Sequence, residues 1–342
     1  MSLRLALGLL LAPLLGAAPL VAADRSAQGP RATLTMEFPG LADGARGGRK
    51  VPIKAHLPAG EGPFPVVIVS HGAGGDWDSH FAQARHLASH GYAVLCVEHV
   101  GSNRERMARE RRPMRAIDAM IRDSAEVLGR PRDIGFAIDR AEEWNRENPA
   151  LRGRLDTRRV GVMGHSFGAF TAMVACGMRP ALDWLTPRVG GGKGLGPDLR
   201  DPRVSCGVAL SPQGVGEPFF IRESFGSLRA PLLGITGSED DQQNGLGAEN
   251  RREAFALWPV GGHRFLWLEG ARHLDFTDST GTERRAIPSP TRDDVQVMVR
   301  AATLLFLDAH LRGDAAAADA LRTEALRPYV RGKVAGAELR AR

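Results

Sequence analysis

The chain has 342 residues and a formal net charge of +6, with 45 Lys or Arg and 39 Asp or Glu. The densest basic run, residues 104–115, contains six arginines but no aromatic residue, and no nucleic-acid-binding motif accompanies it. The three cysteines show neither a disulfide framework nor the Cys/His spacing of a zinc site. These patterns argue against a disulfide-stabilised scaffold and a zinc module, and they predict no nucleic-acid partner.

The N-terminal segment has the pattern of a secretory signal peptide over residues 1–23. A single arginine precedes an apolar stretch at 5–20, and small residues follow it up to Asp24. The apolar stretch is short and contains two prolines, which disfavours a transmembrane anchor. We expect cleavage after Ala23, a periplasmic or secreted location, and no stable membrane insertion once the signal is removed.

Apolar runs alternate with helical patterns along residues 24–342, which predicts one α/β domain with a mostly parallel, eight-stranded sheet and helices on both faces. The first two strands alternate apolar and polar residues, as partly exposed antiparallel strands do, and the later strands are continuously apolar. The predicted strands are 31–38, 50–57, 65–71, 92–98, 159–165, 204–211, 231–236 and 264–269. The predicted helices are 79–90, 133–147, 167–178, 245–258 and 293–311.

Three stretches fit neither pattern and are predicted to be loop insertions, at 101–123, 179–203 and 213–229. Because loops at the carboxyl ends of parallel strands form the substrate pocket in such folds, these insertions are the expected pocket walls. The glycine-rich run at 190–196 lacks the residue order of a phosphate-binding loop. The tract after residue 314 is rich in Ala and Arg and is expected to be peripheral.

The motif Gly164-His165-Ser166-Phe167-Gly168 is the most informative part of the chain. It lies between an apolar strand pattern and a helix-forming run, so the serine is at the apex of a sharp strand-to-helix turn. This arrangement is typical of the nucleophile elbow of α/β-hydrolases, in which small flanking residues let the hydroxyl stand clear of the sheet. The motif predicts the α/β-hydrolase fold with Ser166 as nucleophile.

A serine nucleophile needs a general base, which in this fold follows it in the chain. His273 comes just after the last predicted strand, where a loop can bring its imidazole to Ser166. His263 precedes that strand and His310 is in the last predicted helix, so neither is well placed. The sequence therefore predicts His273 as the base.

The orienting acid is expected after the penultimate strand, where Glu239, Asp240 and Asp241 are adjacent. Asp240 has the usual spacing after the glycine of that turn and is the predicted acid. Asp241 is the alternative acid and Glu239 a more distant one.

Acyl transfer also needs hydrogen-bond donors for the developing oxyanion. One predicted donor is the backbone N–H of Phe167, directly after the nucleophile. The other is expected in the glycine-rich turn Ser70–Gly75, where Ala73 is the predicted donor and Gly74 the alternative.

Four motifs in this order resemble the platelet-activating-factor acetylhydrolase and dienelactone-hydrolase-like group of α/β-hydrolases. They are Ser70–Gly75, residues 87–94, residues 97–102 and residues 164–168. The resemblance covers about residues 50–275 and implies a serine esterase without metal or cofactor. It implies short acyl, lipid-like or polyester-like esters as substrates, with Ser166, His273, Ala73 and Phe167 in the roles given above.

The chain departs from this group in two respects. Ser211 occupies the position after the sixth strand where the animal acetylhydrolases have their acid, so the acid has to come from Asp240 or its neighbours. Dienelactone hydrolases use a cysteine where this chain has Ser166, so lactone opening of that type is not expected. Glu98 and His99 fit the group's pattern and are interpreted as supporting residues.

These observations predict an exported serine hydrolase that cleaves carboxylic esters through an acyl-enzyme. Two alternatives remain open, a peptidase or amidase that uses the same triad and a catalytically silent binding protein with the same fold. Because a protonated imidazole cannot act as a base, activity should be weak at about pH 5 and full at about pH 8.

Overall fold

The computed structural model describes residues 24–241, 247–278 and 289–342, so the predicted signal peptide lies outside the described residues. The main sheet has nine strands, and β2 and β3 form a separate two-stranded sheet. The strands are β1 (Thr33–Phe38), β2 (Ala42–Asp43), β3 (Arg49–Lys50), β4 (Ile53–Pro58), β5 (Phe64–Ser70), β6 (Ala93–Val97), β7 (Leu155–His165), β8 (Val204–Leu210), β9 (Leu232–Glu239), β10 (Arg264–Arg272) and β11 (Ala337–Ala341). The α-helices are α1 (Phe81–Ser89), α2 (Arg104–Ala108), α3 (Pro113–Arg122), α4 (Ser124–Glu147), α5 (Phe167–Ala175), α6 (Ala248–Ala254), α7 (Arg292–Leu311), α8 (Ala315–Asp319) and α9 (Thr323–Leu326).

The strand order in the main sheet is β1-β4-β6-β5-β7-β8-β9-β10-β11. The six strands from β6 to β10 in this order are parallel to one another, and β4 and β11 run antiparallel to them at either side. Parallel strands share a direction, so the segments that follow β5, β7, β9 and β10 all leave from one edge of the sheet. That edge is where every predicted catalytic residue lies.

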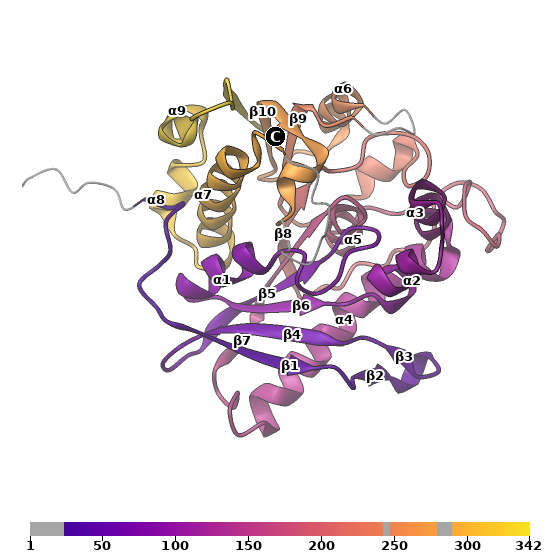
Figure 1. Ribbon diagram of the computed structural model, residues 1–342, viewed down its shortest axis with the longest axis horizontal. Coiled ribbons are helices and arrows are strands. Elements are labelled where there is room, and N and C mark those ends of the chain that lie inside the picture. The colour runs from indigo at the N-terminus through magenta and orange to yellow at the C-terminus, as the bar shows by residue number, and fades with distance from the viewer. Residues whose placement is uncertain (1–23, 242–246, 279–288) are drawn as a thin grey trace, which may run out of the picture.

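Both faces of the sheet are covered by helices (Figure 1). Along β5, Val66 and Ile68 pack into a core cluster with α4 and α5, whereas Val67 and Val69 pack into a second cluster with α1 and α7. Successive strand side chains point to opposite faces, so a strand covered on both faces needs apolar residues at every position. This explains the continuously apolar strands in the sequence.

All eight predicted strands are present within a few residues of their expected bounds, and β11 is the ninth strand of the main sheet. Residues of the tract expected to be peripheral form this strand, which pairs antiparallel with β10 at the edge of the sheet. The prediction of eight strands was therefore one short. The sequence Ala-Glu-Leu-Arg-Ala of β11 has little intrinsic strand preference, and its pairing with β10 makes it a strand.

The predicted loop at 101–123 was wrong, because it contains the helices α2 and α3. Pro113 is in the first turn of α3, a position where the missing N–H of proline is not needed, and Ala116 and Met120 are buried on one face. Helix α4 begins at Ser124 rather than at residue 133, and it continues through Pro131, although proline usually ends or kinks a helix.

Candidate active site

Ser166 lies at the sharp turn between β7 and α5, as the elbow motif predicts. Its φ of 56° and ψ of −116° are strained for a residue with a side chain. Its N–H donates to the Leu210 carbonyl at 3.0 Å, and its own carbonyl accepts from Gln213 Nε2 at 3.0 Å. These bonds to the end of β8 and the loop after it hold the strained turn, and the side chain of Ser166 stays partly exposed.

The two glycines of the motif are required by close packing between the elbow and the end of β5. A Cβ on Gly168 would lie 2.0 Å from the carbonyl oxygen of Ser70, and a Cβ on Gly164 would lie 2.2 Å from the carbonyl oxygen of Gly168. Both distances are far below van der Waals contact. The elbow therefore lies directly against the backbone that leads into the turn after β5.

We expect Gly168→Ala to lower the free energy of unfolding by at least about 1–3 kcal/mol, because the new methyl group would overlap a backbone oxygen that cannot rotate away. Urea unfolding of the variant and the wild type measures this loss. Gly40→Ala is the matched control, since a Cβ there would meet nothing within 4 Å. Equal stability of the two variants would contradict the close packing of the elbow.

His273 and Asp240 are hydrogen-bonded to each other, as predicted from their positions after β10 and β9. Nδ1 of His273 is 2.8 Å from Oδ1 of Asp240. Oδ2 of Asp240 accepts from the Thr236 hydroxyl at 2.7 Å, and Nε of Arg251 is 3.6 Å from Oδ1. Burial raises the pKa of the Asp240 carboxyl, but Arg251 and His273 together hold that pKa well below its usual range. Asp240 is therefore a buried carboxylate suited to orienting the imidazole.

The other candidate acids have different partners. Oδ1 of Asp241 accepts from the N–H of Ala248 in the first turn of α6 at 2.9 Å. The carboxylate of Glu239 accepts from Nε of Arg272 at 2.7 Å on the surface. Among these three neighbours the structure thus brings Asp240 to His273.

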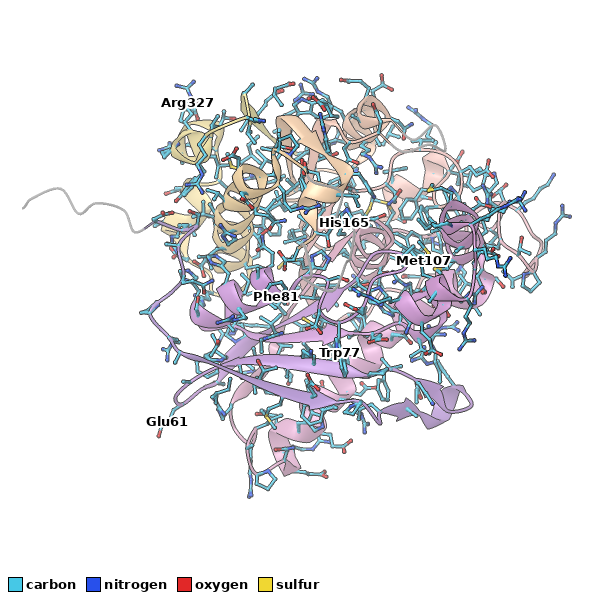
Figure 2. The ribbon with its side chains drawn as sticks, in the orientation of Figure 1. Glu61, Trp77, Phe81, Met107, His165 and Arg327 are labelled. Carbon is cyan, nitrogen blue, oxygen red and sulfur yellow. The ribbon has the colours of Figure 1, made fainter. Side chains whose placement is uncertain are left out.

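His165 connects the elbow to the segment that contains His273. Nε2 of His165 is 2.9 Å from the carbonyl oxygen of His273, and the centroids of the two rings are 4.7 Å apart. Burial lowers the pKa of His165 well below its ordinary value, so the ring is neutral. A carbonyl can only accept, so Nε2 of this neutral ring is the protonated nitrogen. Figure 2 labels His165 near the middle of the molecule. This contact holds the segment that contains His273 against the residue that precedes Ser166.

The two segments that carry the predicted oxyanion donors both lie close to the nucleophile. The ideal Cβ position of Gly72 is 3.6 Å from Cβ of Ser166, so the turn after β5 passes next to the serine. Within the described residues the N–H groups of Ala73 and Phe167 have no acceptor, whereas the N–H of Gly74, the alternative donor, is bonded to the Ser102 carbonyl at 2.9 Å. Phe167 is the first residue of α5, where backbone N–H groups have no acceptor in the helix. The amides of Ala73 and Phe167 are thus available to a ligand.

Two of the three predicted insertions border this site. Side-chain atoms of Met107 on α2, labelled in Figure 2, lie 3.3 to 3.4 Å from the ideal Cβ position of Gly74. Gln213, at the start of the insertion 213–229, bonds the Ser166 carbonyl as described above. The insertion that contains α2 and the loop after β8 therefore form walls of the site.

A second Ser–His–Asp arrangement lies beneath the turn after β5. The Ser70 hydroxyl is 2.8 Å from Nε2 of His99, and Nδ1 of His99 is 2.8 Å from Oδ2 of Asp133 on α4. All three residues are 0% exposed, so a substrate cannot reach Ser70. We interpret this group as a support for the turn after β5, in line with the expectation that His99 is a supporting residue.

Several buried histidines make the folded chain sensitive to acid. Burial is the main cause that lowers their pKa values, to about 4 for His56, His80, His99 and His263 and to about 3 for His86. In the unfolded chain histidine has a pKa of about 6.5, so between about pH 6.5 and 4 the unfolded chain binds more protons. The stabilisation from these neutral rings is present above that range and is lost as the pH falls through it.

We expect the free energy of unfolding to fall by about 1.4 kcal/mol per pH unit for each such histidine below about pH 6.5. Urea unfolding at about pH 8, 6 and 5 measures this slope. His80 is one of these rings, so His80→Gln should reduce the slope. A constant free energy of unfolding over this range would contradict the neutral burial of these rings.

Three further properties of the described residues bear on possible ligands. No group of three or more His, Cys, Asp or Glu side chains is arranged to hold a metal ion there. Cys96, Cys176 and Cys206 are buried and free. Of the helices in this part of the chain, none has the length and apolar character needed to cross a bilayer.

Comparison with known proteins agrees with the fold. The α/β hydrolase fold family matches residues 65–182, from β5 to the loop after α5. With this match, the strand order and the elbow, the chain has the α/β-hydrolase fold. It is similar to the platelet-activating factor acetylhydrolase of Cavia porcellus, to which it is 24% identical over 310 residues. The alignment covers 78% of this chain and 62% of that protein, so the chain spans less than two thirds of the relative's length.

Proposed function

We propose that this α/β-hydrolase is an exported serine esterase, with Ser166 as nucleophile, His273 as general base and Asp240 as the orienting acid. The observation that carries the proposal is the 2.8 Å bond from His273 to the buried Asp240, at the same sheet edge as the strained Ser166. A buried carboxylate keeps the imidazole in the tautomer whose Nε2 can accept a proton.

In this mechanism the Ser166 hydroxyl attacks the ester carbonyl carbon while Nε2 of His273 accepts its proton. The carbonyl π electrons move to oxygen, and the amides of Ala73 and Phe167 stabilise the resulting oxyanion. Collapse of this intermediate expels the alcohol, which takes the proton from His273, and leaves an acyl ester on Ser166. Water then attacks the acyl-enzyme by the same steps and releases the acid.

The likeness to the acetylhydrolase supports short acyl, lipid-like or polyester-like esters as the substrate class. Residues 1–23 support export, and hence a periplasmic or secreted location. The shape of the walls around Ser166 would determine which acyl groups fit the site. Met107 is one of the residues in these walls.

The proposal is tested with p-nitrophenyl esters from acetate to palmitate at about pH 8, with p-nitroacetanilide as the matched amide. We expect turnover of one or more of the esters, much slower turnover of the amide, and covalent labelling of Ser166 by a fluorophosphonate. Faster turnover of the amide would favour the amidase alternative. Absence of both turnover and labelling would favour the binding-protein alternative.

A further inference from the structure

Arg130 is a fully buried cation in the second turn of α4. Its side chain is among the largest in the chain with under 2% exposure. In the described structure the polar contacts of its nitrogens are with neutral groups, namely the hydroxyls of Ser102 and Thr171 and the residue His71. Burial lowers the pKa of Arg130 to about 9. A buried cation without a directly bonded carboxylate is unfavourable for stability, so a role in the site is the better explanation for it.

On one side, Arg130 holds the turn after β5 at both ends of Ala73. Nη2 of Arg130 donates to the His71 carbonyl at 2.8 Å, and Nε donates to the Ser102 hydroxyl at 3.0 Å. The backbone carbonyl of Ser102 in turn accepts from the N–H of Gly74 at 2.9 Å. The backbone is thus held before and after the residue that carries one proposed oxyanion donor.

On the other side, the same guanidinium contacts Phe167, which carries the second proposed donor. Cζ of Arg130 lies 4.1 Å from the centroid of the Phe167 ring. Nη1 donates to the Thr171 hydroxyl at 3.5 Å, and that hydroxyl donates to the Phe167 carbonyl at 3.0 Å. One side chain therefore contacts both segments from which the oxyanion donors come.

We propose that Arg130 is a positioning residue that fixes the Ala73 and Phe167 amides relative to each other in the oxyanion hole. The inference rests on the proposed esterase function. A planar guanidinium can donate in its plane to His71 and Ser102 while its face lies on Phe167. A lysine ammonium has no such face and would keep only part of these contacts. Misplacement of a catalytic group by about 1 Å costs on the order of a hundredfold in rate, so modest loosening should be measurable.

The test compares Arg130→Lys and Arg130→Met with the wild-type protein. Steady-state turnover of p-nitrophenyl butyrate gives kcat and KM, and titration with a fluorophosphonate counts the active sites. The Ki of a trifluoromethyl ketone measures how well the oxyanion hole binds an oxyanion, because Ser166 adds to the ketone to form an anionic hemiketal. We expect kcat per active site to fall about 10- to 100-fold, KM to change by less than about threefold, and the ketone Ki to rise in parallel with the loss of kcat.

Arg203→Lys is the matched control, because Arg203 forms its ion pairs with Asp201, Asp139 and Glu142 away from the elbow. It should leave kcat and Ki unchanged. If the Arg130 variants do not fold, Phe167→Leu removes the aromatic face that Arg130 contacts, together with the ring's packing on Phe170 and Phe219. It should lower kcat and weaken ketone binding by about three- to tenfold.

Unchanged kcat per active site, or a lower kcat with unchanged Ki, would overturn the role of Arg130 alone. A wild type that neither hydrolyses esters nor binds the ketone would overturn this proposal together with the esterase function.

Discussion

Replacement of Ser166 by alanine should reduce ester turnover by about 10⁴- to 10⁶-fold, because it removes the hydroxyl that is proposed to form the acyl-enzyme. The residual rate would come from the oxyanion donors and substrate binding. Initial rates on p-nitrophenyl acetate and butyrate measure the effect, and fluorophosphonate labelling should disappear with the hydroxyl. The structure should be retained, since Ser166 makes its described hydrogen bonds through its backbone.

Ser205→Ala is the matched control, because Ser205 is a partly exposed residue within β8 and has no place in the proposed site. It should keep the wild-type rate and labelling. Peptide mapping of the labelled protein is decisive because Ser70 also belongs to a Ser–His–Asp arrangement. A label on Ser70, or undiminished turnover by Ser166→Ala, would show that the nucleophile has been assigned wrongly.

The main parts of the candidate site could be predicted from sequence because each follows a recognisable strand. The elbow is a local pattern, and the chain order of the fold then limits the base and the acid to residues after the last two parallel strands. The structure brings His273 and Asp240 together as this reasoning requires. The choice between Asp240 and Asp241 could not be decided as firmly, because adjacent residues differ only in which way their side chains point.

The supports of the site were less predictable because they come from distant segments. Ser70, His99 and Asp133 are on β5, after β6 and on α4, and nothing in the local sequence shows that they meet. The burial of Arg130 could not be predicted from the sequence either. Arginine in a helix is usually exposed, and the burial of this one depends on how α4 packs on α5. His165 was visible within the elbow motif, but its partner is the backbone of His273, which no side-chain pattern reveals.

The same distinction between local and distant signals applies to the fold. The parallel strands are apolar throughout because both faces are covered, and this pattern can be recognised in the sequence of each strand alone. By contrast, β11 is defined by its pairing with β10, and α4 continues past Pro131 because it is packed against the sheet. Long-range packing decides these features.

Asp240→Asn should lower kcat by about 10³- to 10⁴-fold while Asp241→Asn leaves it within about twofold of wild type. An amide can present its N–H₂ to Nδ1 of His273 and so favour the wrong tautomer, and it cannot stabilise the imidazolium. The change also leaves Arg251 buried beside a neutral group, so the free energy of unfolding should fall by about 3–5 kcal/mol. Steady-state kinetics and urea unfolding measure the two losses.

The pH dependence separates the acid from the base. Because the pKa of Asp240 lies well below its usual range in the folded protein, its stabilising charge is present above the ordinary carboxyl pKa and is lost only in stronger acid. Loss of activity between about pH 8 and 5 therefore cannot arise from protonation of Asp240. In Asp241→Asn the side-chain oxygen can still accept from the N–H of Ala248, and only the negative charge at the start of α6 is lost. The variant should therefore cost no more than about 0.3–1 kcal/mol in stability and have no catalytic effect. A large kcat loss in Asp241→Asn, with Asp240→Asn nearly normal, would transfer the acid role to Asp241 and require the loop after β9 to rearrange when substrate binds.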